Sequence, residues 1–227
     1  DLLINCVGLT SVEQCEANPT KAYYLNAEVP SILAKTCFQQ KVSFIHISTD
    51  HLFDGLIGFR SESDIPSPLN QYAYTKLKGD KNVIYNNPDS LIIRTNFFGL
   101  GPNYKPSFSD IIINTLENKQ TIKLFTDVFF TPIHVNELAD IIFELLKNKE
   151  KGIYNIASDE RISKYEFGVM IAENMNFPKA LIIPCLIGNR KDLVKRPNDM
   201  SLSNNKMKKK LNFKIKSISN QMFNRIK

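Results

Sequence analysis

The sequence predicts an α/β fold built on a mostly parallel sheet. Short apolar runs of strand length alternate with longer stretches in which apolar residues recur every three or four positions. The first pattern is typical of buried strands and the second of amphipathic helices. Strands separated by such helices form βαβ units, whose strands run parallel. With 227 residues, 43% of them hydrophobic, the chain is long enough to bury such a core.

The first part of the chain is expected to supply two strands and two helices. Residues 2–7 are rich in aliphatic side chains and predict a strand, and residues 13–35 follow a helical period. Residues 42–47 predict the second strand. Gly, Asp, Pro and Ser are frequent over residues 50–68, which predicts a long loop, and the next helix is expected over residues 69–84.

The rest of the chain continues the alternation without an internal repeat. The lysines at 208–210 form its one low-complexity segment. Strands are expected at residues 91–94, 122–124 and 153–156, and helices at residues 110–117, 136–146 and 164–175.

Composition excludes several classes of protein. The apolar content is too high for a disordered chain, and no apolar run approaches the roughly 20 residues of a membrane-spanning helix. The four cysteines show no CxxC spacing, so we interpret them as reduced thiols of a cytoplasmic protein. No clustered His, Asp and Glu spacing indicates a metal site.

Positive charge is concentrated at the C-terminal end. Residues 190–227 carry 12 Lys/Arg against Asp192 and Asp199, whereas the formal net charge of the whole chain is only +6. A basic segment can bind nucleic acid, but no nucleic-acid motif accompanies this one. Met207, Leu211 and Phe213 lie among its lysines, which favours the solvated face of a packed terminal segment.

Polar residues follow the predicted strands where a parallel sheet binds its ligands, at the carboxyl ends. Residues 6–10, 48–51 and 95–99 follow the first three strands. The middle set is Ser-Thr-Asp-His, which is polar directly after an apolar strand. We therefore expect the functional site at this edge.

A strand-end hydroxyl followed by Tyr-x-x-x-Lys on a helix has the composition of a carbonyl-reducing site. Tyr72 and Lys76 are one helical turn apart and share a face, so we expect the ammonium to lower the phenol pKa from about 10. Thr49 would then hold the substrate oxygen, and a nicotinamide cofactor would supply hydride.

The chain contains a second such pair, Tyr74 and Lys78. Lys76 lies at the edge of the apolar stripe of the helix, whereas Tyr74 shares its face with Lys78 and Lys81 and is expected to be exposed. Tyr72 and Lys76 are therefore the pair that can face a cleft. The alternative for either pair is a surface tyrosine whose ring packs on the aliphatic part of the lysine side chain.

Five segments occur in the order and spacing seen in extended short-chain dehydrogenases/reductases. They are NCVGLTSVEQCE (5–16), HISTDHLFDG (46–55), SPLNQYAYTKLKGD (67–80), LIIRTNFFG (91–99) and KRPNDMSLSNNKM (195–207). Over nearly its whole length the chain resembles the dTDP-4-dehydrorhamnose reductase family of sugar-nucleotide reductases. The resemblance implies a Rossmann-like sheet with a smaller C-terminal substrate-binding lobe.

The resemblance also implies roles for individual residues. Thr49, Tyr72 and Lys76 match the catalytic triad, in which Tyr72 protonates the C4 oxygen of a 4-keto sugar and Lys76 also holds the nicotinamide ribose. Asn26 matches an asparagine on the helix behind the site. The residues that match the cofactor-binding set, with Tyr72 and Lys76, are Cys6, Val7, Gly8 and Thr10.

Three substrate-facing positions depart from the usual family residues. His51 stands where Tyr is usual, Asn96 where Ser is usual and Phe97 where Trp is usual. His51 is either a hydrogen-bond donor to the substrate or a polar rim residue. Arg196, which precedes Pro197, is our candidate for the substrate diphosphate, because a guanidinium forks onto phosphate oxygens; the alternative is a surface arginine.

The glycine-rich turn that seats the cofactor pyrophosphate in this family is absent from these residues, because the nine glycines form no GxGxxG. We therefore expect a fragment or processed product that lacks the N-terminal βαβ half and binds NADP(H) weakly. Residues 1–156 would be the partial Rossmann-like domain, with 131–134 contributing to the substrate lobe, and residues 157–227 would form most of that lobe and the basic segment.

The resemblance implies an NADP- or NAD-dependent oxidoreductase that reduces a nucleotide-linked 4-keto sugar for cell-surface polysaccharide. Its partner would be the sugar nucleotide, with no nucleic acid or membrane, and a homodimer stays open. Two alternatives share the fold: a non-catalytic regulatory relative, such as the regulatory subunit of methionine adenosyltransferase, and a sugar-nucleotide epimerase or dehydratase. The complete Thr49, Tyr72 and Lys76 set favours the reductase over the regulator.

Overall fold

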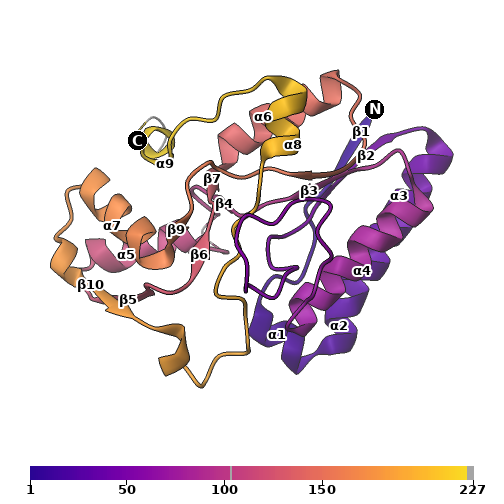
Figure 1. The fold of residues 1–227 in the computed structure, drawn as a ribbon. Helices are drawn as coiled ribbons and strands as arrows, with labels where there is room; N and C mark the ends of the chain where they lie inside the picture. The colour runs from indigo at the N-terminus through magenta and orange to yellow at the C-terminus, as the bar shows by residue number, and fades with distance from the viewer. Residues whose placement is uncertain (103, 224–227) are drawn as a thin grey trace.

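The computed structural model describes residues 1–102 and 104–223 and has an α/β fold with a parallel central sheet (Figure 1). The strands lie in the order β1-β2-β3-β8 and all pairs are parallel, which confirms the predicted class. Each predicted strand lies within two residues of an observed one. The strands are β1 (Leu2–Asn5), β2 (Ser43–Ile47), β3 (Leu91–Arg94) and β8 (Gly152–Asn155).

Helices cover both faces of this sheet because its strands alternate their side chains between them. Phe44 and Ile92 point to one face and pack under α3 (Val29–Gln40) and α4 (Gln71–Asn86). Ile45, Leu91 and Ile93 point to the other face, where α6 (Val135–Lys147) lies. The alternation decides which strand-end side chains face α4, and this places the site.

The single helix expected over residues 13–35 is wrong in detail, because this region is broken. It forms α1 (Val12–Ala17), α2 (Pro19–Tyr23), a π-helix η1 (Tyr24–Glu28) and then α3. The break at Asn18 has a local cause, since proline disfavours the helical conformation in the residue before it. The Asn18 side chain then accepts a hydrogen bond from the Lys21 amide and starts α2.

A second core builds a lobe beside the sheet, seen in Figure 1 around α5, α7, β5 and β10. Phe167 lies at its centre and contacts the rings of Phe98, Phe108 and Phe130. Its elements are α5 (Phe108–Glu117), α7 (Lys164–Asn174), α9 (Ile218–Phe223), β5 (Ile122–Phe125), β10 (Ile182–Cys185) and the two-residue strands β4 (Phe97–Phe98), β6 (Phe129–Phe130), β7 (Ile133–His134) and β9 (Ile162–Ser163).

The basic C-terminal segment packs on the body of the protein. Helix α8 (Asn205–Leu211) buries Met207 completely against the α6 side of the sheet. Lys208 pairs with Asp159 at 2.9 Å, and Lys210 pairs with Glu150 at 3.0 Å. The expectation of a packed segment is thus confirmed for the described part, and residues 224–227 lie outside it. In the described ranges, no helix combines the length and apolarity needed to cross a bilayer.

Candidate active site

A cavity of about 440 Å³ opens at the carboxyl edge of the central sheet. The segments that follow β1, β2 and β3 line it, together with the first turns of α4 and α6. A cavity therefore lies at the edge of the sheet where the site is expected. The sequence-predicted residues that the cavity brings together are Cys6, Val7, Gly8, Thr10, Thr49, His51, Tyr72, Lys76, Asn96 and Phe97.

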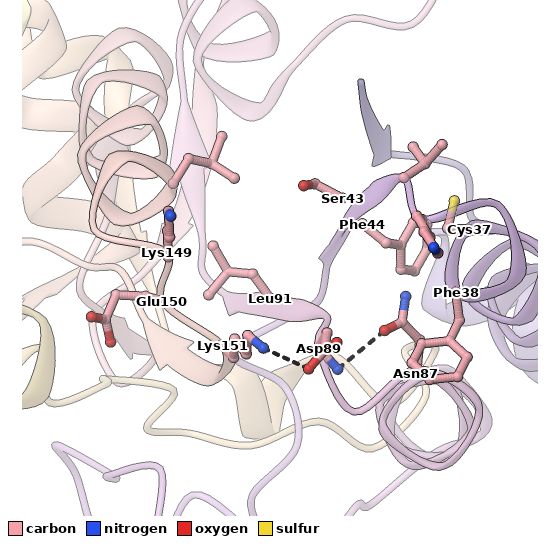
Figure 2. Close-up of a pocket in the computed structure, with 13 residues that line it drawn as sticks. Cys37, Phe38, Ser43, Phe44, Asn87, Asp89, Leu91, Lys149, Glu150 and Lys151 are labelled. Atoms are coloured by element: carbon pink, nitrogen blue, oxygen red, sulfur yellow. Dashed lines mark hydrogen bonds and ion pairs between the residues drawn. The ribbon is translucent and has the colours of Figure 1, made fainter.

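A larger cavity, of about 670 Å³, lies at the opposite edge of the sheet, around the amino ends of β2 and β3 (Figure 2). Figure 2 shows Lys151 paired with Asp89, at 2.6 Å, and the Asp89 backbone amide bonded to Asn87. Lysines suit this place because α3, α4 and α6 end nearby with the negative ends of their dipoles. The residues expected to carry chemistry line the other cavity, so we assign the candidate site to the smaller one.

Tyr72 is held at the start of α4 by a helix cap. The Asn70 side chain accepts a hydrogen bond from the Ala73 amide at 2.9 Å, which fixes the first turn of the helix. The Tyr72 ring is buried and meets the His51 ring edge-on, with centroids 5.4 Å apart. The Thr49 hydroxyl donates to Asp50 Oδ1 at 3.3 Å and accepts from the His51 backbone amide at 3.2 Å. Thr49 and Tyr72 line the same cavity, and the Thr49 side chain acts to lower the pKa of the Tyr72 phenol.

The acidity of Tyr72 differs from the expectation. Burial raises the pKa of the phenol above its ordinary value, and this effect exceeds the lowering by the Thr49 side chain. Asp50 raises the pKa further. The expected lowering by Lys76 is therefore wrong for this structure, because the Lys76 amine is directed at the Ile47 carbonyl, 2.7 Å away. Tyr72 stays protonated across the neutral range.

Lys76 is itself strongly perturbed. Its side chain is buried beneath the cavity, and burial lowers the pKa of the amine to about 8, against a smaller raising effect of Asp80. Burial also raises the pKa of the Cys6 thiol, on which Lys76 acts in the opposite direction. A buried lysine whose pKa lies near neutrality is typical of functional sites.

Polar side chains face Tyr72 from the other side of the cavity. Asn96 donates a hydrogen bond to Asp50 at 2.7 Å, and His51 Nε2 lies 3.9 Å from the other Asp50 oxygen. Burial lowers the pKa of His51, while the Asp50 carboxylate raises it. Phe97 is half exposed beside them. This group offers hydrogen bonds and an aromatic surface to a polar ligand.

Asn26 supports the turn that follows β1. Its side chain accepts a hydrogen bond from the Leu9 amide at 2.8 Å and donates to the Leu9 carbonyl at 3.0 Å and to Thr75 at 3.1 Å. A Cβ added at Gly8 would lie 3.0 Å from the Asn26 side-chain oxygen. The π-helix η1 thus carries a buried amide that fixes the predicted cofactor-lining turn to α4.

The second tyrosine–lysine pair lies outside the cavity. Tyr74 is 43% exposed, and the Lys78 amine lies 5.5 Å from the centre of its ring. The choice between the two pairs by helical face is confirmed.

Comparison with known proteins places this site in a family. The family model described as the RmlD substrate binding domain matches residues 1–227. The chain belongs to this family. A dTDP-4-dehydrorhamnose reductase from Clostridium acetobutylicum has a similar structure, with a TM-score of 0.90 and 28% identity over 99% of this chain and 79% of that one.

Two curated relatives differ in the function that their names state. A probable low-salt glycan biosynthesis reductase of Haloferax volcanii is 37% identical over 186 residues, which are 80% of this chain and 62% of that protein. The rat methionine adenosyltransferase 2 subunit beta is 29% identical over 191 residues, 81% of this chain and 57% of that protein. The chain therefore spans about three fifths of the length of these relatives.

The cavity of this RmlD-family chain contains polar groups that could form hydrogen bonds with a bound dinucleotide. The hydroxyls of Ser48 and Thr95 are buried, line the cavity and have no hydrogen-bond partner among the described residues. Such groups cost free energy unless a ligand or water pairs with them. The residues present thus fit a hydrogen-bonding cofactor or substrate, whereas no group of three or more potential metal ligands occurs within the described ranges.

Arg196 is the one predicted site residue that does not line the cavity. Its guanidinium pairs with Glu13 and donates to the Val194 carbonyl at 3.2 Å. Its charge nevertheless lowers the pKa of His51. Its assignment to the substrate diphosphate stays a prediction.

Sequence reasoning gave no individual role to some lining residues. Ser48 and Thr95 directly follow β2 and β3 and belong to the strand-end segments already singled out, so their position was the available signal. Lys105 lies in an irregular segment, where no pattern points to the cavity.

Proposed function

We propose that the protein containing this chain is an NADP- or NAD-dependent reductase of a nucleotide-linked 4-keto sugar, in the biosynthesis of cell-surface polysaccharide. One observation carries the proposal. One cavity brings together the buried phenol of Tyr72, the strand-end hydroxyl of Thr49 and, one helical turn further on, the buried amine of Lys76, whose pKa is lowered. The similarity to curated glycan and sugar-nucleotide reductases supports it.

The proposed chemistry is proton donation to a carbonyl oxygen. A bound nicotinamide would supply hydride to the C4 carbon. Thr49 would orient the C4 oxygen by a hydrogen bond, and Tyr72 would transfer its phenolic proton to that oxygen as negative charge develops there. Tyr72 is protonated before turnover and can therefore act as the donor, although its raised pKa makes it a weaker acid than a free phenol.

The cofactor would lie along the turn after β1. Cys6, Val7, Gly8 and Thr10 would line it, Asn26 would keep the turn in place, and Lys76 would hold the nicotinamide ribose. The hydroxyls of Ser48 and Thr95, which have no hydrogen-bond partner among the described residues, offer further hydrogen bonds within the same cavity.

The sugar would lie on the side of Asp50, where His51, Asn96 and Phe97 face the cavity. Arg196 would reach the substrate diphosphate after leaving Glu13. We propose that the substrate lobe is the unit built around Phe167, to which residues 98–130 contribute as well as residues 162–187, and that the sheet carries the cofactor and catalytic part. We propose a cytoplasmic enzyme, with the sugar nucleotide as its partner rather than nucleic acid, and leave a homodimer open.

A regulatory function is the second candidate, because the rat methionine adenosyltransferase 2 subunit beta matches 81% of this chain and the Haloferax reductase 80%. A regulator needs no proton donor, so the grouping of Thr49, Tyr72 and Lys76 in one cavity favours catalysis. An epimerase or dehydratase would need a further acid or base beside Tyr72; Asp50 and His51 are the residues available for that role.

The test is a panel of 4-keto sugar nucleotides with NADPH or NADH, following the loss of nicotinamide absorbance. We expect Tyr72→Phe to lower kcat by about 10² to 10⁴ fold, since it removes the proton donor and leaves the ring in place. Tyr74→Phe is the matched control on the same helix and should keep the rate of the unmodified protein. Equal rates for Tyr72→Phe and the unmodified protein would refute the assignment. If the whole protein that contains this chain is folded and oxidises neither cofactor with any keto sugar, the regulatory candidate is favoured.

A further inference from the structure

A layer of polar side chains lies beneath the site, between the sheet and α4. Asn5 and Arg94 are the last residues of β1 and β3, and His46 is the last but one of β2 between them. All three face the same side of the sheet as Phe44 and Ile92, by the alternation of strand side chains. All three polar residues are buried. Helix α4 completes the layer with Lys76 and Asp80, both of which are also buried.

The hydrogen bonds of this layer fix the tautomer of His46. The Val7 backbone amide donates to Asn5 Oδ1 at 3.1 Å, so the oxygen of the Asn5 amide faces Val7 and its NH₂ group faces His46. Asn5 Nδ2 lies 3.0 Å from His46 Nδ1, which must therefore accept. Burial holds the pKa of His46 well below its ordinary value, so the ring is neutral and carries its one proton on Nε2.

The Nε2–H of His46 points at Lys76 and Asp80. Lys76 Nζ lies 3.5 Å from Nε2, and Asp80 Oδ1 lies 4.0 Å from it. Asp80 Oδ1 has no hydrogen-bond partner among the described residues, whereas Asp80 Oδ2 accepts from Arg94 Nε at 3.1 Å. A protonated Nε2 cannot accept a hydrogen bond from an ammonium, but it can donate to a neutral amine or to the carboxylate.

We propose that His46 is a positioning residue of the site: locked by Asn5 with its proton on Nε2, it turns the Lys76 amine toward the Ile47 carbonyl and opposes protonation of that amine. The carboxylate of Asp80, which is paired with Arg94, supplies the negative charge that balances the Lys76 amine when it is protonated. His46 acts through Lys76, so this role rests on the proposed function for its catalytic meaning. The lowered pKa of Lys76 agrees with it.

The first test uses the unmodified protein and needs no activity. We expect the ¹⁵N chemical shifts of the His46 ring to show a protonated Nε2 and an unprotonated Nδ1 throughout pH 6–9. A ring protonated on Nδ1 would overturn the proposal, because Nε2 would then accept from Lys76 and favour its protonation.

The second test titrates Lys76 by the ¹³C shift of its Cε carbon. In His46→Gln the side-chain oxygen can accept from the amine, so we expect Lys76 to bind its proton about tenfold more tightly, a shift of about one pH unit. Asn5→Leu frees the ring to change tautomer and should shift Lys76 in the same direction. The charged or titratable groups that face Lys76 are Asp80, Arg94, Tyr72 and Cys6, and the titration is repeated in Cys6→Ser to exclude the thiol.

The control is Val83→Ala, a buried change on α4 away from the polar layer. It should lower stability without moving the Lys76 titration. An unchanged Lys76 titration in folded His46→Gln and Asn5→Leu would overturn the proposal whether or not the protein proves to be a reductase. If the protein is a reductase, kcat/KM should fall at a higher pH on the alkaline side in His46→Gln and Asn5→Leu. In Val83→Ala this pH should be unchanged.

Discussion

At the scale of single residues, the sequence indicates which groups line the cavity better than it indicates their protonation state. Thr49, Tyr72 and Lys76 are predictable because their order along a strand end and a helix face is a sequence property. The raised pKa of Tyr72 is not predictable, since it depends on burial beside Asp50. The role of His46 depends on its register opposite Asn5, which no local pattern shows.

The buried charge of Lys76 predicts a pH-dependent stability. Its pKa in the folded protein is about 8, below its ordinary value of 10.5, so the folded state releases this proton more readily. Below pH 8 the charge therefore costs about 3 kcal/mol of folding free energy, and the cost disappears as pH rises from 8 to 10.5. We expect Lys76→Met to unfold at higher denaturant than the unmodified protein at pH 7, with the difference shrinking toward pH 10.

Lys81→Met is the matched control, because Lys81 is exposed on the same helix. It should change the free energy of unfolding by less than about 0.5 kcal/mol at both pH values. A Lys76→Met protein whose stability difference is the same at pH 7 and pH 10 would contradict the assigned burial cost.

At the scale of elements, the helices with strong periodicity are the predictable ones. Helix α4 lies two residues from its predicted bounds because its apolar stripe and the Asn70 cap agree. The π-helix η1 and the two-residue strands could not be predicted, since tertiary pairing rather than local preference creates them. Strand β10 was missed because four residues with a proline give no period.

The packing of α4 on η1 leaves no room for a side chain at Gly79. A Cβ there would lie 2.1 Å from the Asn26 carbonyl oxygen, which belongs to a fixed backbone. We expect Gly79→Ala to lower the free energy of unfolding by about 2–3 kcal/mol, despite the better helix propensity of alanine. Gly188→Ala, with no heavy atom within 4 Å of the added carbon, should be nearly neutral in the same denaturation experiment. Equal stabilities of the two variants would contradict this.

Helix α8 is anchored by one side chain. Met207 is fully buried among residues of the sheet and α6, while its neighbouring lysines lie outside. Met207→Ala should cost about 2–5 kcal/mol, as for other buried methionines. Lys209→Ala on the exposed face is the control, and a calorimetric melting temperature equally affected by both changes would argue against the anchor.

At the scale of the whole molecule, the sheet and the lobe have separate cores. Residues 98–130 and residues 162–187 pack together in the core of the lobe. This packing could not be predicted, because it depends on contacts such as Phe98 with Phe167 that are distant in sequence. The location of the site could be predicted, since parallel strands bring their carboxyl ends to one edge.

The described residues contribute one turn and the strand ends to the proposed cofactor site. Without a glycine-rich turn, we expect the 227-residue chain to bind NADP(H) with a dissociation constant weaker than micromolar. Isothermal titration calorimetry with NADP⁺ and NADPH measures this, with Tyr72→Phe as a folded comparison. Micromolar binding to the isolated chain would contradict the prediction.

Strand β1 is one of the two outer strands of the central sheet in the described part of the chain, and Leu2 and Ile4 on it are each 41% exposed. An outer strand presents unpaired peptide groups that act as a template for further strands. In concentrated preparations of the chain, this row is where copies would adhere edge to edge, and a charged side chain beside it would be the simplest protection against aggregation.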